Sequence, residues 1–186
     1  MSVIDTRKRK VIKRTKFNYE VNEFQWSKNG EFFLLSTGQT NGGTVELMSF
    51  SPSKISPVRT ILAHTAQCYC LETDPSDKYL AVGSADALVS LWDLEELICI
   101  RTFARLEWPV RTLSFSYDSA YLASASEDNF IDIANVQTGE QVEALPTKDA
   151  MNTVAWHPKA HLLAFAGDAR QNREGEIRLM VPKKGK

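Results

Sequence analysis

His64, Ser84 and Asp86 are the three residue types that cooperate in nucleophilic hydrolases, where a histidine takes the proton of a serine hydroxyl and a carboxylate orients the histidine. One large class of these enzymes places the serine in a Gly-x-Ser-x-Gly turn, and the chain contains no such motif. No pair of carboxylates is spaced for general acid–base work either. Residue types alone therefore leave the role of this group open, and its meaning depends on the elements that carry it.

The histidines and cysteines do not have the spacing of a metal site. His157 and His161 lie four residues apart, but Pro158 between them argues against the helix that would bring both to one face. Cys68 and Cys70 lie two apart, so a strand would point both to one face without bringing their sulfurs together. The chain has three cysteines, an odd number, and no pair of them has zinc-ligand spacing. The sequence predicts free thiols, a cytosolic or nuclear setting, and no bound metal.

The glycine-rich segment 38–43 does not have the features of a phosphate-binding loop. It lacks the Gly-Lys-Ser/Thr ending and leads into a strand pattern rather than a helix, so we expect a turn there. No segment is long and apolar enough to span a bilayer, and the basic N-terminal residues are not followed by the apolar region of a secretory signal. We therefore expect no catalytic residue, no cofactor, no small-molecule substrate and no membrane association.

An internal repeat organises the chain. Residues 77–93 align with residues 119–135 at a constant offset of 42, with matching Tyr, Leu, Ala, Ser and Asp. Further copies occupy residues 156–168 and 21–50. Each copy consists of short segments of alternating polarity bounded by turn residues, a pattern typical of strands, and no window has a convincing helical stripe. Four short strands per repeat of about 40 residues predict the blades of an all-β propeller.

The strand count predicts a partial propeller of about four blades with incomplete terminal blades. The expected segments are the end of a preceding blade with a basic outer strand (1–17), three four-stranded blades (19–62, 66–105 and 108–148), a last blade without its outer strand (150–181), and a basic tail (182–186). About seven blades at this period would need about 300 residues, so the chain corresponds to the C-terminal half of a propeller. Because both ends stop within a blade, we expect unpaired strand edges there.

The third of these units resembles the WD-repeat family residue by residue. Ala63-His64 stands at the family's Gly-His position, Ser84 and Asp86 stand in its Gly-Ser-x-Asp turn, and Trp92-Asp93 is its Trp-Asp dipeptide. The resemblance implies a buried hydrogen-bond chain between strands, formed by His64, Ser84, Asp86 and Trp92. Such a chain is chemically sensible, because the carboxylate accepts, the imidazole relays, the hydroxyl bridges and the indole donates. The group is then a structural tetrad rather than a catalytic triad.

The next unit matches only part of this tetrad. It keeps Ser126 and Asp128, but Ala134 stands at the tryptophan position and Leu106 stands near the histidine position. We therefore expect the network of this unit to be broken, and the unit to depend more on apolar packing.

Charge is divided unevenly along the chain. Residues 1–16 carry seven basic side chains and one acidic side chain, a net charge of +6, whereas the remainder carries 15 basic and 22 acidic side chains, a net charge of −7. The body is therefore not predicted to be a nucleic-acid-binding platform. The basic N-terminal segment has two interpretations: a contact with phosphate, or a solvated, positively charged edge, which is the commoner case.

Several longer segments resemble the WD-repeat subunit family of the THO complex, part of the transcription–export assembly. They lie, in order, at 17–26, 83–101, 103–116, 124–134, 153–159 and 162–166, and the most specific stretch is Leu106-Glu-Trp-Pro-Val-Arg111. The resemblance implies a non-catalytic scaffold in the nucleus that acts in mRNP assembly and mRNA export. The implied partners are other THO subunits and mRNA export factors, with RNA contacted indirectly. The alternative is an unrelated WD-repeat adaptor or peptide reader in a chromatin or ubiquitin-ligase complex.

The loop from Arg105 to Arg111 is the predicted partner surface. It joins the outer strand of one expected blade to the inner strand of the next, at an end of the propeller where WD-repeat proteins commonly bind partners. Trp108 offers a large apolar ring, Arg105 and Arg111 offer forked hydrogen-bond donors, and both residue types are enriched in interface hot spots. The alternative is that Trp108 folds inward and fills the space left by the missing histidine.

Overall fold

The computed structural model describes residues 1–39, 42–168 and 177–181, and within these ranges the chain forms strands, turns and loops without a helix. Accordingly, the described residues contain no helix that is long and apolar enough to cross a membrane. The predicted basic tail at 182–186 lies outside the described residues. Short alternating segments between turn residues therefore fold as strands, as their period of two requires.

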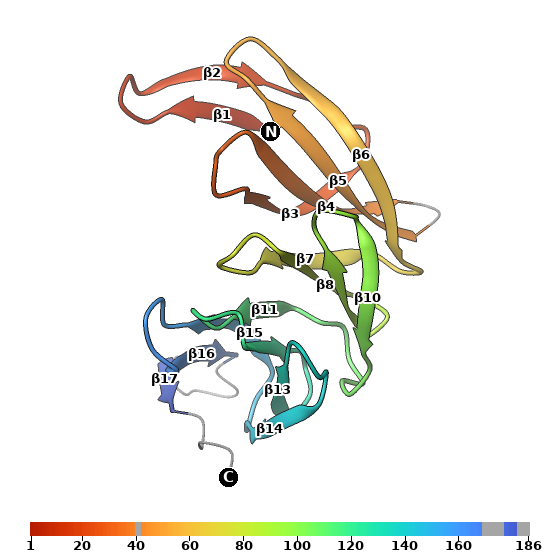
Figure 1. Ribbon diagram of the computed structural model, residues 1–186, viewed down its shortest axis with the longest axis vertical. Helices are drawn as coiled ribbons and strands as arrows, with labels where there is room; N and C mark the ends of the chain where they lie inside the picture. Colours follow the sequence, from red (N-terminus) through yellow and green to blue (C-terminus); the bar gives the residue numbers. More distant parts are fainter. Residues whose placement is uncertain (40–41, 169–176, 182–186) are drawn as a thin grey trace.

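The strands form antiparallel sheets of consecutive strands, which follow one another along an arc (Figure 1). The first sheet is a hairpin of β1 (Ser2–Asp5) and β2 (Lys10–Arg14). The second contains β3 (Glu20–Trp26), β4 (Phe32–Gln39), β5 (Gly42–Phe50) and β6 (Ile55–His64). The third contains β7 (Cys68–Thr73), β8 (Tyr79–Ser84), β9 (Val89–Asp93) and β10 (Ile98–Phe103). The fourth contains β11 (Thr112–Phe115), β12 (Tyr121–Ala125), β13 (Phe130–Asn135) and β14 (Gln141–Pro146), and the last contains β15 (Met151–Trp156), β16 (Leu163–Gly167) and β17 (Ile177–Met180).

The first strands of the four larger sheets lie next to one another. β3 contacts β7, β7 contacts β11, and β11 contacts β15, so these strands form the inner side of the arc. The prediction of an all-β partial propeller with incomplete terminal blades is confirmed by this arrangement. The residue boundaries assigned above to the individual blades remain a prediction.

The apolar core lies between neighbouring sheets rather than within one of them. β8 is buried at every position, because its sheet is covered on both faces. One cluster joins Ala81 and Leu91 to Phe115 of the following sheet, and another joins Ile133 to Phe165 of the last sheet. Each sheet is therefore stabilised mainly by burial against the next one.

Two glutamates on inner strands link one sheet to the next. Glu23 of β3 accepts a hydrogen bond from the backbone N–H of Leu71 at 2.8 Å, and Glu72 of β7 accepts one from the backbone N–H of Phe115 at 2.8 Å. Burial raises the pKa of Glu23, and it raises the pKa of Glu72 to about 7. For Glu72, which is half-buried, the backbone donor offsets part of the cost of desolvation.

Three turns that join the last two strands of their sheets share one backbone geometry. Each begins with an Asp or Asn whose side-chain oxygen accepts hydrogen bonds from the backbone N–H groups two and three residues later. Each ends, four residues after this first position, in the left-handed region. The pairs of first and last residues are Asp5 with Arg9 (φ 52°), Asp93 with Leu97 (φ 55°), and Asn135 with Gly139 (φ 77°).

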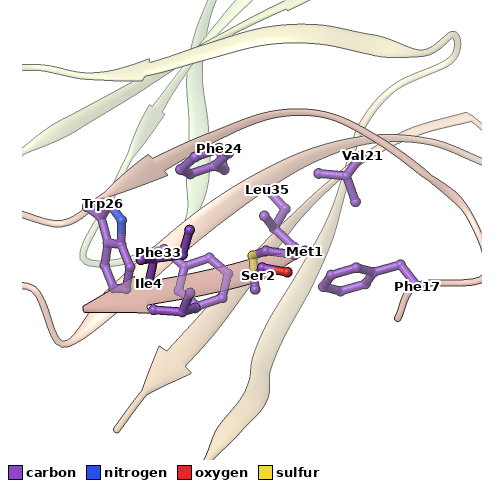
Figure 2. Close-up of a pocket in the computed structure, with 10 residues that line it drawn as sticks. Met1, Ser2, Ile4, Phe17, Val21, Phe24, Trp26, Phe33 and Leu35 are labelled. Carbon is purple, nitrogen blue, oxygen red and sulfur yellow. The ribbon is translucent and has the colours of Figure 1, made fainter. Parts of the chain in front are cut away.

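The two ends of the arc expose apolar surface. In the last sheet, Ile177 and Leu179 of β17 are 77% and 66% exposed. At the other end, an apolar cavity of about 490 Å³ lies between β1 and the sheet of β3 to β6, as Figure 2 shows. Phe17, Phe24 and Trp26 are among the side chains that line it. In the described residues, the face of the β3–β6 sheet that lines this cavity is covered only by the two-stranded hairpin and not by a complete sheet.

Candidate functional site

The structure joins three of the four predicted tetrad residues in one hydrogen-bonded chain. His64 Nδ1 lies 3.2 Å from both carboxylate oxygens of Asp86. His64 Nε2 lies 2.8 Å from the hydroxyl oxygen of Ser90, and Trp92 Nε1–H donates to that same oxygen at 2.7 Å. His64 is the last residue of β6, whereas Ser90 and Trp92 lie on β9. These hydrogen bonds therefore connect two neighbouring sheets.

Ser84 does not take the bridging position that the sequence analysis gave it. Its hydroxyl accepts from the backbone N–H of Asp86 at 3.3 Å and donates to the carbonyl oxygen of Ala66 at 3.3 Å, so it shapes the turn before β9. Ser90 is the bridging serine, which was not identified from the sequence. The available signal was its position two residues before Trp92, which places both side chains on one face of a strand.

The side chains at the centre of this hydrogen-bonded network are buried. Ser90 is 3% exposed and His64 is 7% exposed, and the serine hydroxyl oxygen already accepts from the indole. A nucleophilic serine needs access to its substrate and a free lone pair. The geometry therefore stabilises the fold by satisfying buried polar groups.

The following sheet lacks the histidine and the tryptophan of the tetrad, and a different polar network lies in the corresponding place. Asp132, which lies 42 residues after Ser90, is 1% exposed. Both of its carboxylate oxygens accept from the Arg105 guanidinium, each at 2.8 Å. The Gln141 side chain donates to the same carboxylate at 2.8 Å. A guanidinium–carboxylate pair thus replaces the imidazole–hydroxyl contact, and the missing histidine and tryptophan are compensated.

Asp128 fixes the loop that precedes β11. One of its carboxylate oxygens accepts from the Ser126 hydroxyl at 2.6 Å and from the backbone N–H groups of Glu107 and Trp108 at 3.0 and 3.2 Å. Two residues further on, Val110 is fully buried in the core between the sheets. The backbone around Trp108 is therefore held from both sides.

Trp108 points to solvent. It is 54% exposed, so the alternative in which it fills the space of the missing histidine is wrong. Leu106 and Val110 of the same loop are instead the residues that are buried in the apolar cluster between the sheets. A large apolar ring is thus presented on a loop whose backbone is fixed.

Arg111 is also accessible at this loop, whereas Arg105 is not free to meet a partner. Arg111 pairs with Glu127 at 2.9 Å, and its guanidinium lies over the ring of Tyr69 at 5.1 Å from the centroid. Both members of the ion pair are close to half exposed. We name Trp108, Arg111, Tyr69 and Glu127 the loop surface; Tyr69 and Glu127 belong to other strands and turns and were not identified from the sequence.

The described residues contain no group of three or more His, Cys, Asp or Glu side chains that could hold a metal ion. Cys68 and Cys70 are buried, and burial raises the pKa of the Cys68 thiol to about 12. These thiols are therefore protonated at neutral pH and are not poised as nucleophiles.

Comparison with known proteins gives consistent results. The family described as "WD domain, G-beta repeat" matches residues 55–93 and 97–133. THO complex subunit 3 of Arabidopsis thaliana is 55% identical over 183 residues, which cover 96% of this chain and 56% of that protein. The WD repeat-containing protein AAC3 of Dictyostelium discoideum is 34% identical over 175 residues, covering 94% of this chain and 36% of that protein. The chain thus spans only about half, or less, of the length of these relatives.

Solved structures show the same fold at low sequence identity. The WD40 repeats of RRP9 superpose with a TM-score of 0.73 over 82% of this chain and 46% of that chain, at 19% identity. The structure of U3-55K superposes with a TM-score of 0.77 over 90% of this chain and 50% of that chain, also at 19% identity. At this level of identity, the likeness establishes the propeller fold alone.

Proposed function

Because this chain belongs to the WD-repeat family and is a homologue of THO complex subunit 3, we propose that it acts as a WD-repeat subunit of a THO complex. The observation that carries the proposal is 55% identity over 96% of the chain. In this role the chain is a non-catalytic scaffold in the nucleus. It brings other THO subunits and mRNA export factors together during mRNP assembly and mRNA export.

The loop surface is the part of the described structure that we assign to partner binding. Interface hot spots are rich in Trp, Tyr and Arg, and three of the four residues of the loop surface are of these types. The loop is also rigid, since Asp128 accepts two of its backbone N–H groups and Val110 anchors it in the core. A loop whose backbone is already ordered loses little backbone entropy on binding.

Affinity purification of the tagged chain from its source cells tests the proposal. We expect the other THO subunits to co-purify with the wild-type chain. The Trp108→Ala variant should recover them less well while its melting temperature stays close to that of the wild type, because Trp108 is mostly exposed. Ile100→Ala is the matched control: Ile100 is 49% exposed on β10, and we expect full recovery.

The remaining outcomes distinguish the alternatives. Recovery of chromatin or ubiquitin-ligase components without THO subunits would favour the unrelated WD-repeat adaptor. Recovery of THO subunits by both variants would retain the THO role and move the binding surface elsewhere. A lowered melting temperature of Trp108→Ala would assign Trp108 to packing.

A further inference from the structure

The hairpin of β1 and β2 carries a concentration of positive charge that the fold does not neutralise. Its cations, together with Lys16 just after β2, are Arg7, Lys8, Arg9, Lys10, Lys13, Arg14 and Lys16. All are exposed except Lys13, which is half-buried and donates to the carbonyl oxygen of Ser53 at 3.2 Å. In the described part of the chain, none of the seven forms an ion pair. The hairpin lies at one end of the arc, as Figure 1 shows.

The tip of this hairpin has a fixed backbone. Asp5 accepts from the backbone N–H groups of Arg7 and Lys8 at 3.0 and 2.8 Å. Arg9 has a φ of 52°, in the left-handed region that glycine or asparagine adopts with less strain. Because Leu97 takes the same conformation (φ 55°) in the turn after β9, this conformation belongs to the turn itself.

The two equivalent turns show that the turn does not require this charge. The positions of Arg7 and Lys8 are occupied by Glu95 and Glu96 in the turn after β9 and by Gln137 and Thr138 in the turn after β13. The position of Arg9 is occupied by Leu97 in one and by Gly139 in the other. The same backbone therefore tolerates acidic, neutral and basic side chains, so the basic sequence of the first turn is not explained by folding.

We propose that this hairpin, through its tip at residues 6–10 and the cations of β2, contacts the phosphate backbone of RNA. Long, exposed cationic side chains without an ion-pair partner can bind a flexible polymer that carries one negative charge per nucleotide. The tip carries no apolar or aromatic side chain of the kind that anchors protein interfaces. The contact is independent of nucleotide sequence, because a phosphate contact reads no base. The choice of RNA among polyanions rests on the proposed function.

The chain itself supplies a variant that keeps the turn. Arg7→Gln, Lys8→Thr and Arg9→Gly together place the side chains of the turn after β13 on the equivalent turn of the hairpin. We expect the full chain to bind fluorescent oligouridylate, as measured by anisotropy. The triple variant should bind about tenfold or more weakly at low salt, and the slope of log affinity against log salt should fall by about 2, as three lost phosphate contacts on a single strand predict.

A second triple variant is the control for net charge. Lys28→Gln, Arg59→Gln and Lys148→Gln remove three exposed cations away from the hairpin, and we expect little loss of affinity. Equal losses in the two triple variants, or no binding by the wild-type chain, would overturn the inference. Competition by polyglutamate as effective as that by unlabelled RNA would also overturn it, in favour of an acidic protein segment.

The inference and the proposed function fail in different experiments. If the wild-type chain recovers THO subunits but does not bind oligouridylate, the RNA contact is wrong and the THO role stands. If the hairpin variant loses RNA affinity and still recovers THO subunits, the RNA contact is supported as a separate surface. If the chain binds RNA through the hairpin without recovering THO subunits, the contact stands and the THO role fails.

Discussion

Ser90 accepts from the indole of Trp92 and meets the imidazole of His64, so a single buried hydroxyl connects the two halves of the polar chain. If the hydroxyl donates to His64 Nε2, the Nδ1–H of the imidazole faces the carboxylate of Asp86, and every group in the chain has a partner. The stabilising unit is therefore Asp86, His64, Ser90 and Trp92.

Replacing the two serines separately tests this assignment. We expect Ser90→Ala to lower the free energy of unfolding by about 1–3 kcal/mol, because the indole N–H and one imidazole nitrogen lose their partner in a buried site. Ser84→Ala should cost less, because both of its contacts are at 3.3 Å. Thermal and denaturant unfolding of the two variants measure the difference, and an equal or larger loss for Ser84→Ala would contradict the assignment.

At the residue scale, the sequence predicts which residue types form the polar chain but not the direction in which each side chain points. His64, Asp86 and Trp92 occupy the places that the WD-repeat resemblance implies. Arg105 was expected at the surface, but its guanidinium turns inward to Asp132, 27 residues later. That choice depends on a partner brought near by the folded sheet, so no local pattern of residues could reveal it.

The loop before β11 is the element in which the expectation and the structure differ most. The sequence predicts a broken network around Asp128, because Ala134 and Leu106 interrupt the tetrad. In the structure the Asp128 carboxylate accepts three hydrogen bonds, two of them from the loop backbone. The loop thus obtains its order from a side chain of the β12–β13 turn.

Asp128→Ala should therefore destabilise the chain as much as Asp86→Ala does, by about 1–3 kcal/mol, because the buried Ser126 hydroxyl and two part-buried loop amides lose their acceptor. Amide hydrogen exchange at Glu107 and Trp108 should become faster in the variant. Glu127→Ala is the control, because its ion pair with Arg111 is nearly half exposed and contributes little. Unchanged exchange at both amides would show that the loop is ordered by packing alone.

The strands themselves were well predicted, for a physical reason. Alternating polarity at a period of two is a local property, and the constant offset of 42 residues repeats it. The side chains that pack between neighbouring sheets could not be predicted in the same way. Whether Leu106 or Trp108 fills such a space depends on its shape, which the facing sheet determines.

On the scale of the whole molecule, the exposed strand β17 limits the behaviour of the isolated chain. Ile177 and Leu179 are 77% and 66% exposed on the last strand of its three-stranded sheet. An apolar strand with an unpaired edge pairs readily with another chain. We expect the purified chain to self-associate with increasing concentration in sedimentation experiments.

Ile177→Lys with Leu179→Lys should suppress this association, because charged side chains on an edge strand oppose pairing between chains. Val142→Lys serves as the control, since Val142 is 37% exposed on the outer strand β14. A wild-type chain that remains monomeric at all concentrations would contradict the prediction. Equal suppression by the control would mean that β17 is not the contact.

The turn shared by the hairpin of β1 and β2 and by two later sheets also bears on how such molecules diverge. Its geometry depends on the first residue, which caps two amides, and on the last, which takes the left-handed conformation. The residues two and three positions after the first one are exposed in all three turns, so mutation can change their charge freely. Selection can therefore change the charge of the exposed turn residues separately in each blade of a ring, while the backbone geometry of the turn stays the same. The number of blades then limits how many turns of different surface charge one protein can carry.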